Sequence, residues 1–414
     1  MNVVRRSATA LAVTAVIGAA AAPAAYAASP APSLPSGLYG TGDPTYDGVW
    51  RQSLALLAQD TAGVRPAAAA VDWLTGQQCA DGSFAPYRAD PAKACDAKTP
   101  VDTNMTSAAV QALAALGGHE AATGKAVAWL KSVQNKDGGW GYTAGGPSDA
   151  NSTSLAVGAL AAAGERPADV VKGGRSPYDA LLALAVPCDA AEGAGAFAYQ
   201  PGDKGALAAN ADATAAAVLA ALGKGLTAEA ATAGAAPSCT GGGDPTPEQA
   251  AANGAAYLAG ALAGDGHLMS ALAGAEDRPD YGNTADAVVA LAAQGGARQA
   301  AEPLKWLERN ALTWARQTGP AAYAQLILAA HAAHADPRDF GGTDLVQRLN
   351  ATGPAPQDAT PAAGPDREAA SESESESESE SDDGFGVWWY VGVCLVAGVG
   401  IGFLLSGRNR GRQP

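Results

Sequence analysis

The sequence predicts an all-α domain, an (α/α)6 toroid in which six inner and six outer helices alternate around a ring. Two observations predict the ring: a helix ending in a glycine turn repeats at fixed spacing, and a helix rich in Ala, Leu and Val follows each turn. A fixed internal period of this kind is typical of arrays of helical hairpins. Separately, an uncharged apolar run near the C-terminus predicts one transmembrane helix after an acidic disordered stalk.

The first 27 residues have the pattern of a secretory signal. Arg5 and Arg6 give the positive start, an alanine-rich apolar run follows, and Ala25-Tyr26-Ala27 gives a small-residue cleavage pattern. We therefore expect residues 1–27 to direct export. A linker over 28–46 then leads into the toroid, which we expect to occupy 47–350.

Each outer helix is expected to end in a tight turn. Trp73, Trp129 and Tyr257 each precede Leu and stand eight residues before Asp-Gly, and an apolar residue follows two positions after that glycine: Phe84, Trp140 and Leu268. Leu184 with Glu192-Gly193 is a degenerate fourth copy, and Trp306-Leu307 begins a fifth without the turn. Glycine permits the reversal, and the apolar residue is expected to fill the gap between adjacent hairpins.

Four of the inner helices are expected to begin at Asp or Asn, with Thr four residues later: those starting at Asp102, Asp149, Asn210 and Asp280. Asp, Asn and Thr suit the first turn of a helix, and a helix that is apolar all round is surrounded by others. The expected inner helices lie near 49–59, 105–116, 152–163, 212–222, 284–294 and 321–334. The expected outer helices lie near 65–78, 123–135, 177–186, 248–262, 299–314 and 343–349. Twelve alternating helices favour a closed ring over an open solenoid, which leaves raw ends.

The C-terminal region predicts a membrane anchor. Residues 351–384 are rich in Pro and Ala and then alternate Ser with Glu, which suits an extended disordered spacer. Residues 385–405 carry no charge, and the arginines of the tail at 406–414 predict a cytoplasmic C-terminus. We therefore expect a single-pass protein of the cell membrane with its N-terminal domain outside the cell.

Charge and cysteine content support this location. The net charge of −15 argues against nucleic acid as a partner. Cys79, Cys95, Cys188 and Cys239 lie in the exported segment and predict two disulfides. Of three pairings we prefer Cys79 with Cys95, which closes a local loop, and the other pair then follows. Zinc binding is the alternative, but it would favour close pairs such as C-x-x-C, and the sequence has none.

Two motifs resemble known families. The stretch from Gln134 to Trp140, after a Trp-Leu helix, resembles the repeat of squalene cyclases and protein prenyltransferase β-subunits, the terpenoid cyclase and prenyltransferase superfamily of toroids. The stretch VDTNMTSAAVQAL, from Val101, is similar to the inner-helix starts of transcobalamin and intrinsic factor, whose cobalamin-binding domain is also a toroid. The second resemblance implies a cobalamin-like ligand handed to a membrane transporter, with a partner protein supplying the β-rich domain that covers the ligand.

The sequence lacks the catalytic residues on which the enzymes of the first family depend. A class II terpene cyclase uses an Asp-x-Asp-Asp cluster, which is absent from 28–350. A protein prenyltransferase needs zinc held by Asp, Cys and His, and the one candidate is His331 and His334 with Asp336, which has no cysteine nearby. We read these histidines as the polar end of a helix. The sequence thus predicts no catalytic residue, no metal and no cofactor of its own.

The predicted site is a polar rim. Chain direction places every inner-helix N-terminus on one face of the ring, where the helix dipoles add positive potential, and a polar rim over an apolar funnel suits a small ligand. The rim residues are Asp102, Asn104, Thr106, Asp149, Asn151, Thr153, Asn210, Asp212, Thr214, Asp280, Thr284 and Asp286. Helix capping is the structural alternative for the aspartates, and Asp286 fits it least.

Non-catalytic binding of a small molecule or of a surface protein is therefore the leading hypothesis. Two others stay open. The rim carboxylates could serve a surface enzyme that acts on glycan or cell-wall polymer, which needs two carboxylates across a cleft. Alternatively, the toroid is a structural or adhesive module that binds another protein.

Overall fold

The computed structural model describes residues 35–241, 244–270 and 278–357. The signal segment at 1–27, most of the acidic spacer, the apolar run at 385–405 and the basic tail lie outside these residues. The expectations about export, stalk and anchor therefore stay predictions. Among the described residues, no helix has the length and apolar character needed to cross a bilayer.

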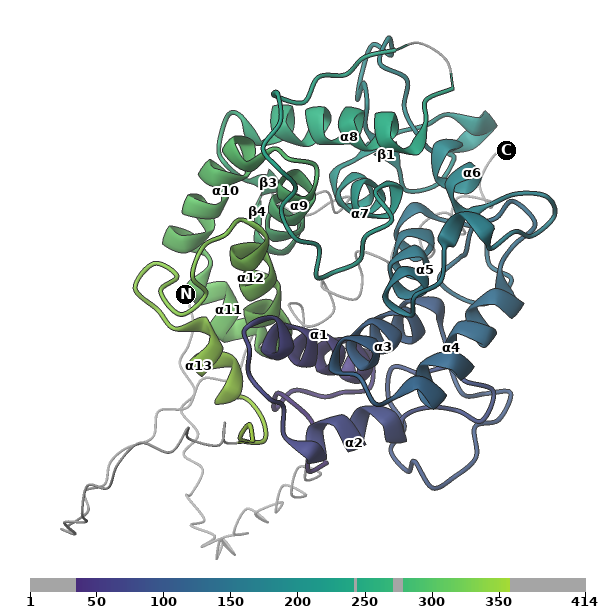
Figure 1. Ribbon diagram of the computed structural model, residues 1–414, viewed down its shortest axis with the longest axis vertical. Helices are drawn as coiled ribbons and strands as arrows, with labels where there is room; N and C mark the ends of the chain where they lie inside the picture. The colour runs from purple at the N-terminus through teal and green to yellow at the C-terminus, as the bar shows by residue number, and fades with distance from the viewer. Residues whose placement is uncertain (1–34, 242–243, 271–277, 358–414) are drawn as a thin grey trace, which may run out of the picture. The chain divides into compact units, whose positions relative to one another are not determined.

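Six inner helices form a closed ring (Figure 1). Each packs against the next in chain order, and the last packs against the first, so the ring has no open end. Most of their side chains are buried, as expected for helices with neighbours on several sides. The inner helices are α1 (Gly48–Thr61), α3 (Thr103–Leu116), α5 (Ala150–Ala162), α7 (Ala211–Ala221), α9 (Tyr281–Ala293) and α12 (Pro320–Ala332).

The other helices lie outside this ring (Figure 1). They are α2 (Ala68–Gly76), α4 (Glu120–Val133), α6 (Pro177–Leu182), α8 (Pro247–Leu262), α10 (Ala297–Asn310), α11 (Leu312–Thr318) and α13 (Leu345–Asn350). One expectation was wrong: the outer helix predicted over 299–314 is broken at Ala311. Because α10 packs against α9 and α11 packs against α12, the break lets the chain follow the ring from one inner helix to the next.

Short elements lie at the inner-helix N-termini and in the loops. Strand β1 (Phe197–Ala198) pairs antiparallel with β2 (Ala209–Asn210), and β3 (Leu268–Met269) pairs in the same way with β4 (Pro279–Asp280). These pairs hold the residues that precede α7 and α9. Two single-turn 3-10 helices, η1 (Pro167–Asp169) and η2 (Asp203–Gly205), complete the described elements.

The repeated Asp-Gly turns need glycine because they touch the next repeat. Gly82 has a φ of +96° and Gly138 a φ of +90°, a region that favours glycine. A Cβ at Gly82 would lie 2.3 Å from the Lys125 carbonyl oxygen, and one at Gly138 would lie 2.1 Å from that of Ser176. The glycines therefore let each turn pack directly on the outer helix that follows.

The two ends of the described chain hold the ring together. Nε2 of Gln59, on α1, donates to Oδ1 of Asn350, on α13, at 2.7 Å. The backbone N–H of Gly40 donates to the Thr352 carbonyl at 2.8 Å. The fully buried Tyr39 donates its hydroxyl to Gln59 at 3.0 Å. These bonds tie the first and last segments to each other.

The segment between α7 and α8 crosses the end of the ring where the inner helices finish (Figure 1). The N–H of Leu226 donates to Oε1 of Gln111, on α3, at 2.8 Å. The N–H of Ala231 donates to the carbonyl of Ala292, in the last turn of α9, at 3.0 Å. Ala228 is buried between these two attachments. The segment therefore covers this end of the ring, opposite the predicted rim.

Two disulfides fix loops outside the inner ring. Cys79 is bonded to Cys95, and Cys188 is bonded to Cys239, which is the pairing preferred from sequence. The second bond attaches the end of the α7–α8 segment to the loop after α6. Beside it, Oδ1 of Asn253, on α8, accepts a hydrogen bond from the Thr240 N–H at 3.1 Å.

Candidate functional site

Four residues of the predicted rim act as N-caps of inner helices. In each case a side-chain oxygen accepts the backbone N–H three residues later, which satisfies a donor that the helix leaves free. The bonds are Asp102 with Met105 at 2.8 Å, Asp149 with Ser152 at 2.7 Å, Asn210 with Ala213 at 2.8 Å and Asp280 with Asn283 at 3.0 Å. These residues therefore have a structural role that sequence analysis named as the alternative.

The four rim threonines join each inner helix to its own turn. Each hydroxyl oxygen accepts the backbone N–H of the apolar residue that fills the gap between hairpins. The bonds are Phe84 to Thr106 at 3.0 Å, Trp140 to Thr153 at 3.0 Å, Phe197 to Thr214 at 2.9 Å and Leu268 to Thr284 at 3.0 Å. In the degenerate copy at Glu192-Gly193, for which sequence analysis named no such residue, the gap is filled by Phe197, four residues beyond Gly193.

Two tyrosines that sequence analysis missed stand over the rim. Tyr142 and Tyr199 follow Trp140 and Phe197 by two positions, and their carbonyls accept the first N–H groups of the preceding inner helices, at Thr103 (2.9 Å) and Ala150 (3.0 Å). Burial raises the pKa of both hydroxyls, and so do the nearby charges of Asp102 at Tyr142 and of Asp149 and Asp212 at Tyr199. Their regular position after the gap-filling residue is the sequence signal that would have found them.

Two hydrogen-bonded pairs connect neighbouring inner helices near the rim. Nδ2 of Asn151, on α5, donates to Oδ2 of Asp212, on α7, at 2.6 Å. Nε2 of Gln325, on α12, lies 3.3 and 3.4 Å from the two carboxyl oxygens of Asp286, on α9. We call Asn151, Asp212, Asp286 and Gln325 the carboxyl–amide cluster. Asp286 lies in the second turn of α9, because that helix begins three residues earlier than predicted.

The cluster borders a space inside the ring. Asp286 and Gln325 are partly accessible although both chain neighbours of each residue are buried, and the same holds for Leu155 and Ala216. These positions belong to four successive inner helices, each of which has helices on its other sides. The partly accessible side chains therefore face the ring axis.

Several buried polar atoms of the inner helices have no partner within the described residues. They include Oδ1 of Asn104, Oγ of Ser107, Oδ1 of Asn151, Oγ of Ser154 and Oε1 of Gln325. Asn104, Asn151 and Ser154 are 3, 5 and 6% exposed. Buried polar groups in folded proteins are nearly always hydrogen-bonded, to protein or to water. A set of unpaired oxygens on α3, α5 and α12 is thus the most unusual feature of the ring.

The acidic groups are shifted toward their neutral forms. Burial raises the pKa of Asp102 to about 7 and that of Asp149 to about 6. Burial also raises the pKa of Asp212 to about 6 and that of Asp286 to about 7, and the charge of Asp212 adds to the shift of Asp286. Among the described ion pairs, none joins Asp212 or Asp286 to a lysine or arginine. The cluster is therefore acidic, and these ion pairs give it no basic partner.

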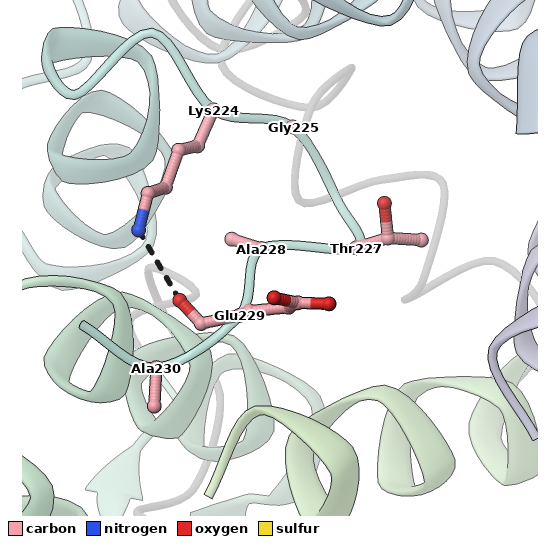
Figure 2. A pocket seen from close by; sticks show the side chains of 6 residues that line it. All are labelled: Lys224, Gly225, Thr227, Ala228, Glu229 and Ala230. Carbon is pink, nitrogen blue, oxygen red and sulfur yellow. Dashed lines mark hydrogen bonds between the residues drawn. The ribbon is translucent and has the colours of Figure 1, made fainter. Parts of the chain in front are cut away.

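A separate cavity lies on the α7–α8 segment at the covered end of the ring. It measures about 310 Å³ and is lined by Lys224, Gly225, Thr227, Ala228, Glu229 and Ala230. Figure 2 shows that the Lys224 ammonium contacts the Glu229 carbonyl, at 3.2 Å, while the Glu229 carboxyl group points away from it. The lining is a single stretch of chain, so this cavity is a feature of the covering segment and not of the rim.

The histidine cluster considered from sequence does not form a metal site here. His331 lies in the last turn of α12, and His334 follows that helix with a φ of +58°. Within the ranges that the structure describes, no group of three or more His, Cys, Asp or Glu side chains is placed to hold a metal ion.

The fold and the repeated rim define an α/α toroid. Residues 44–227 match the family model of the prenyltransferase alpha-alpha toroid domain. This part of the chain is therefore similar to the toroid domain of the terpenoid cyclase and prenyltransferase superfamily, which confirms the first resemblance found in the sequence. No curated protein matches the chain.

Three solved structures are similar in arrangement at low identity. The ent-copalyl diphosphate synthase from Streptomyces platensis is 17% identical, with a TM-score of 0.45, and the match covers 69% of this chain and 50% of that one. A protein from Actinoplanes is 17% identical (TM-score 0.32; 68% and 99% covered). A type II terpene cyclase from Scytonema is 18% identical (TM-score 0.30; 67% and 77% covered). The chain spans about half the length of the first of these.

Proposed function

We propose that the protein is a membrane-anchored binding protein of the cell surface, whose toroid captures a small polar molecule without changing it. The anchor and the export signal are those predicted at 385–405 and 1–27. The ligand would enter at the rim, because the α7–α8 segment covers the other end of the ring.

The unpaired buried oxygens carry this proposal. A buried polar group without a partner costs about 1–3 kcal/mol, and Asn104, Asn151 and Gln325 each present such an oxygen near the ring axis. A bound molecule with hydrogen-bond donors would satisfy several of these atoms at once. Four of the predicted ligand residues and all four threonines have structural partners, so the expected contacts concentrate on Asn104, Asn151, Asp212 and Asp286.

The likeness of the α3 start to the cobalamin carriers makes corrinoids the first ligands to test. Full-length protein in detergent is titrated with a corrinoid panel by calorimetry, and its melting temperature is followed in parallel. We expect saturable binding that Asn151→Ala weakens and that Asn310→Ala, at an exposed site on α10, leaves unchanged. A panel that gives neither heat nor a melting shift would remove corrinoids. Transfer of the bound ligand to a membrane transporter is a further expectation of this proposal.

One observation favours an enzyme as the second candidate. Burial raises the pKa of Asp286 to about 7 and that of Asp212 to about 6, and the charge of Asp212 adds to the shift of Asp286. A carboxyl group that is partly protonated at neutral pH can act as a general acid, and a neighbouring carboxylate as a base. Hydrolysis or elimination on a panel of glycans and cell-wall polymers, lost in Asp286→Asn, would support this function. An inactive parent protein would leave binding as the better account.

A further inference from the structure

The carboxyl–amide cluster is built almost entirely of hydrogen-bond acceptors. Asn151 and Gln325 each direct their amide N–H groups toward a carboxyl group, Asp212 and Asp286 respectively. These contacts fix the amide orientation, so Oδ1 of Asn151 and Oε1 of Gln325 are left over, buried and without a partner. Four residues on four successive inner helices thus present oxygens to the same region.

The region also carries negative charge, and none of the described ion pairs places a lysine or arginine at Asp212 or Asp286. The charge of Asp280, the cap of α9, disfavours ionisation of both Asp212 and Asp286. Bringing carboxylates together in an enclosed site is unfavourable unless an opposite charge joins them. A neutral ligand would satisfy the amide oxygens but would leave this repulsion in place.

An aromatic surface borders the cluster. A Cβ at Gly282 would lie 3.5 Å from Nε2 of Gln325 and 3.7 Å from the ring of Trp314, so the amide and the indole both lie beside this glycine. Trp314 stacks on Tyr281 with ring centroids 5.6 Å apart, and Tyr281 stacks on Trp306 at 5.2 Å. The stack holds Trp314 beside the acceptors. Aromatic faces attract organic cations.

From this arrangement we infer that the ring binds an organic cation that carries N–H donors, such as a primary ammonium or guanidinium group, between Asp212 and Asp286. An ammonium group has three donors and no acceptor, and a guanidinium group has five donors, which matches a site whose unpaired amide atoms are acceptors. This inference rests on the proposed binding function and names the chemical class of its ligand. The amide oxygens of Asn151 and Gln325 take the remaining N–H groups, and the alkyl part of the ligand lies toward Trp314.

The test uses five simple probes and the full-length protein in detergent. Calorimetric titrations compare 1,5-diaminopentane and agmatine with choline, 1,5-pentanediol and calcium chloride. We expect the ammonium and guanidinium probes to bind at least tenfold more tightly than the diol, which lacks charge, and than choline, which lacks N–H donors. Calcium is expected to bind more weakly than either amine.

Variants locate the site. Asp212→Asn and Asp286→Asn keep side-chain size and should each weaken binding of 1,5-diaminopentane at least tenfold, with Trp314→Leu weakening it to a smaller extent. Asp203→Asn, on the exposed η2, is the matched control and should bind as the parent does. Melting curves of each variant separate loss of binding from loss of folding.

Three results would overturn the inference: equal affinity for the diol, tightest binding of calcium, or amine binding that survives both aspartate substitutions. If the amines fail while a corrinoid or another neutral molecule binds, the cationic class is wrong and the binding function stands. If neither amines nor neutral molecules bind, both proposals fall.

Discussion

Asn151 on α5 and Asp212 on α7 are joined by a hydrogen bond of 2.6 Å between Nδ2 and Oδ2. The two residues occupy the same place in their repeats, two positions after the N-cap. One repeat places an amide there and the next a carboxyl group, so their side chains bond across the helix interface. The same position holds Asn104 on α3 and Gly282 on α9. The cap residues and the threonines therefore recur in each of these repeats, while the residue two positions after the cap varies. This variable position is where the ligand site can differ between toroids.

Stability should fall as the pH rises through neutrality. Asp286 has a pKa of about 7 in the folded protein and near 4 when unfolded. Between these values the folded state binds more protons, so the free energy of unfolding decreases with rising pH. Asp286→Asn removes this contribution. We expect the variant to gain roughly 1–3 °C in melting temperature relative to the parent between pH 5 and pH 8.

Thermal melts at both pH values check this, with Asp203→Asn as the control that should show no pH-dependent difference. A parent that becomes relatively more stable than Asp286→Asn at pH 8 would show that Asp286 is ionised and well solvated in the folded protein.

The threonine at the fourth position after the cap should be needed for its hydroxyl group. Thr153→Val keeps the shape but leaves the buried Trp140 N–H without an acceptor, which costs about 1–3 kcal/mol. Thr153→Ser keeps the oxygen and should cost less. Denaturant unfolding of both variants gives the comparison. A serine variant that is as unstable as the valine variant would mean that the methyl group, and not the hydrogen bond, is what matters.

The repeated turn should reject any side chain at its glycine. Gly138→Ala places a Cβ against the Ser176 carbonyl and also forces alanine into positive φ. Gly145→Ala, at a φ of +77° with no atom within 4 Å, has only the conformational cost of about 1–2 kcal/mol. We expect Gly138→Ala to lower the melting temperature clearly more than Gly145→Ala. Similar losses would indicate that the neighbouring repeat moves aside easily.

The second disulfide should stabilise the protein more than the first. The Cys188–Cys239 bond closes a loop of 51 residues, and the Cys79–Cys95 bond one of 16. Loop-closure entropy gives roughly 4 and 3 kcal/mol for such loops. Paired Cys→Ser substitutions, compared by denaturant unfolding under oxidising conditions, measure each contribution. Loss of the second bond should also release the end of the covering segment, seen as faster hydrogen exchange at Thr240.

Sequence periodicity was sufficient for most of the ring. The Asp-Gly turns and the Asp/Asn-to-Thr spacing gave the positions of inner and outer helices because each motif serves a local hydrogen bond that recurs in every repeat. The role of Phe197 could not be predicted because the loop before it is two residues longer than in the other copies. The place of Gln325 in the site could not be predicted because α12 begins with Gly-Pro and has no cap motif. The crossing of the α7–α8 segment depends on contacts with α3 and α9, and no local pattern encodes those.

Ring closure has a consequence for how the domain is made and how it can change. Helix α12 begins at Pro320, 259 residues after α1 ends at Thr61, yet the two are neighbours. Helix α1 can therefore complete its packing against α12 only after nearly all of the domain has been synthesised. Contacts between residues so far apart in the sequence slow folding. An open array can gain or lose a repeat at its end with little harm. In this closed ring, the addition or loss of one hairpin would change the circumference and so the packing of every other hairpin. New ligand specificity is therefore easier to reach through substitutions on the inner helices than through a change in the number of repeats.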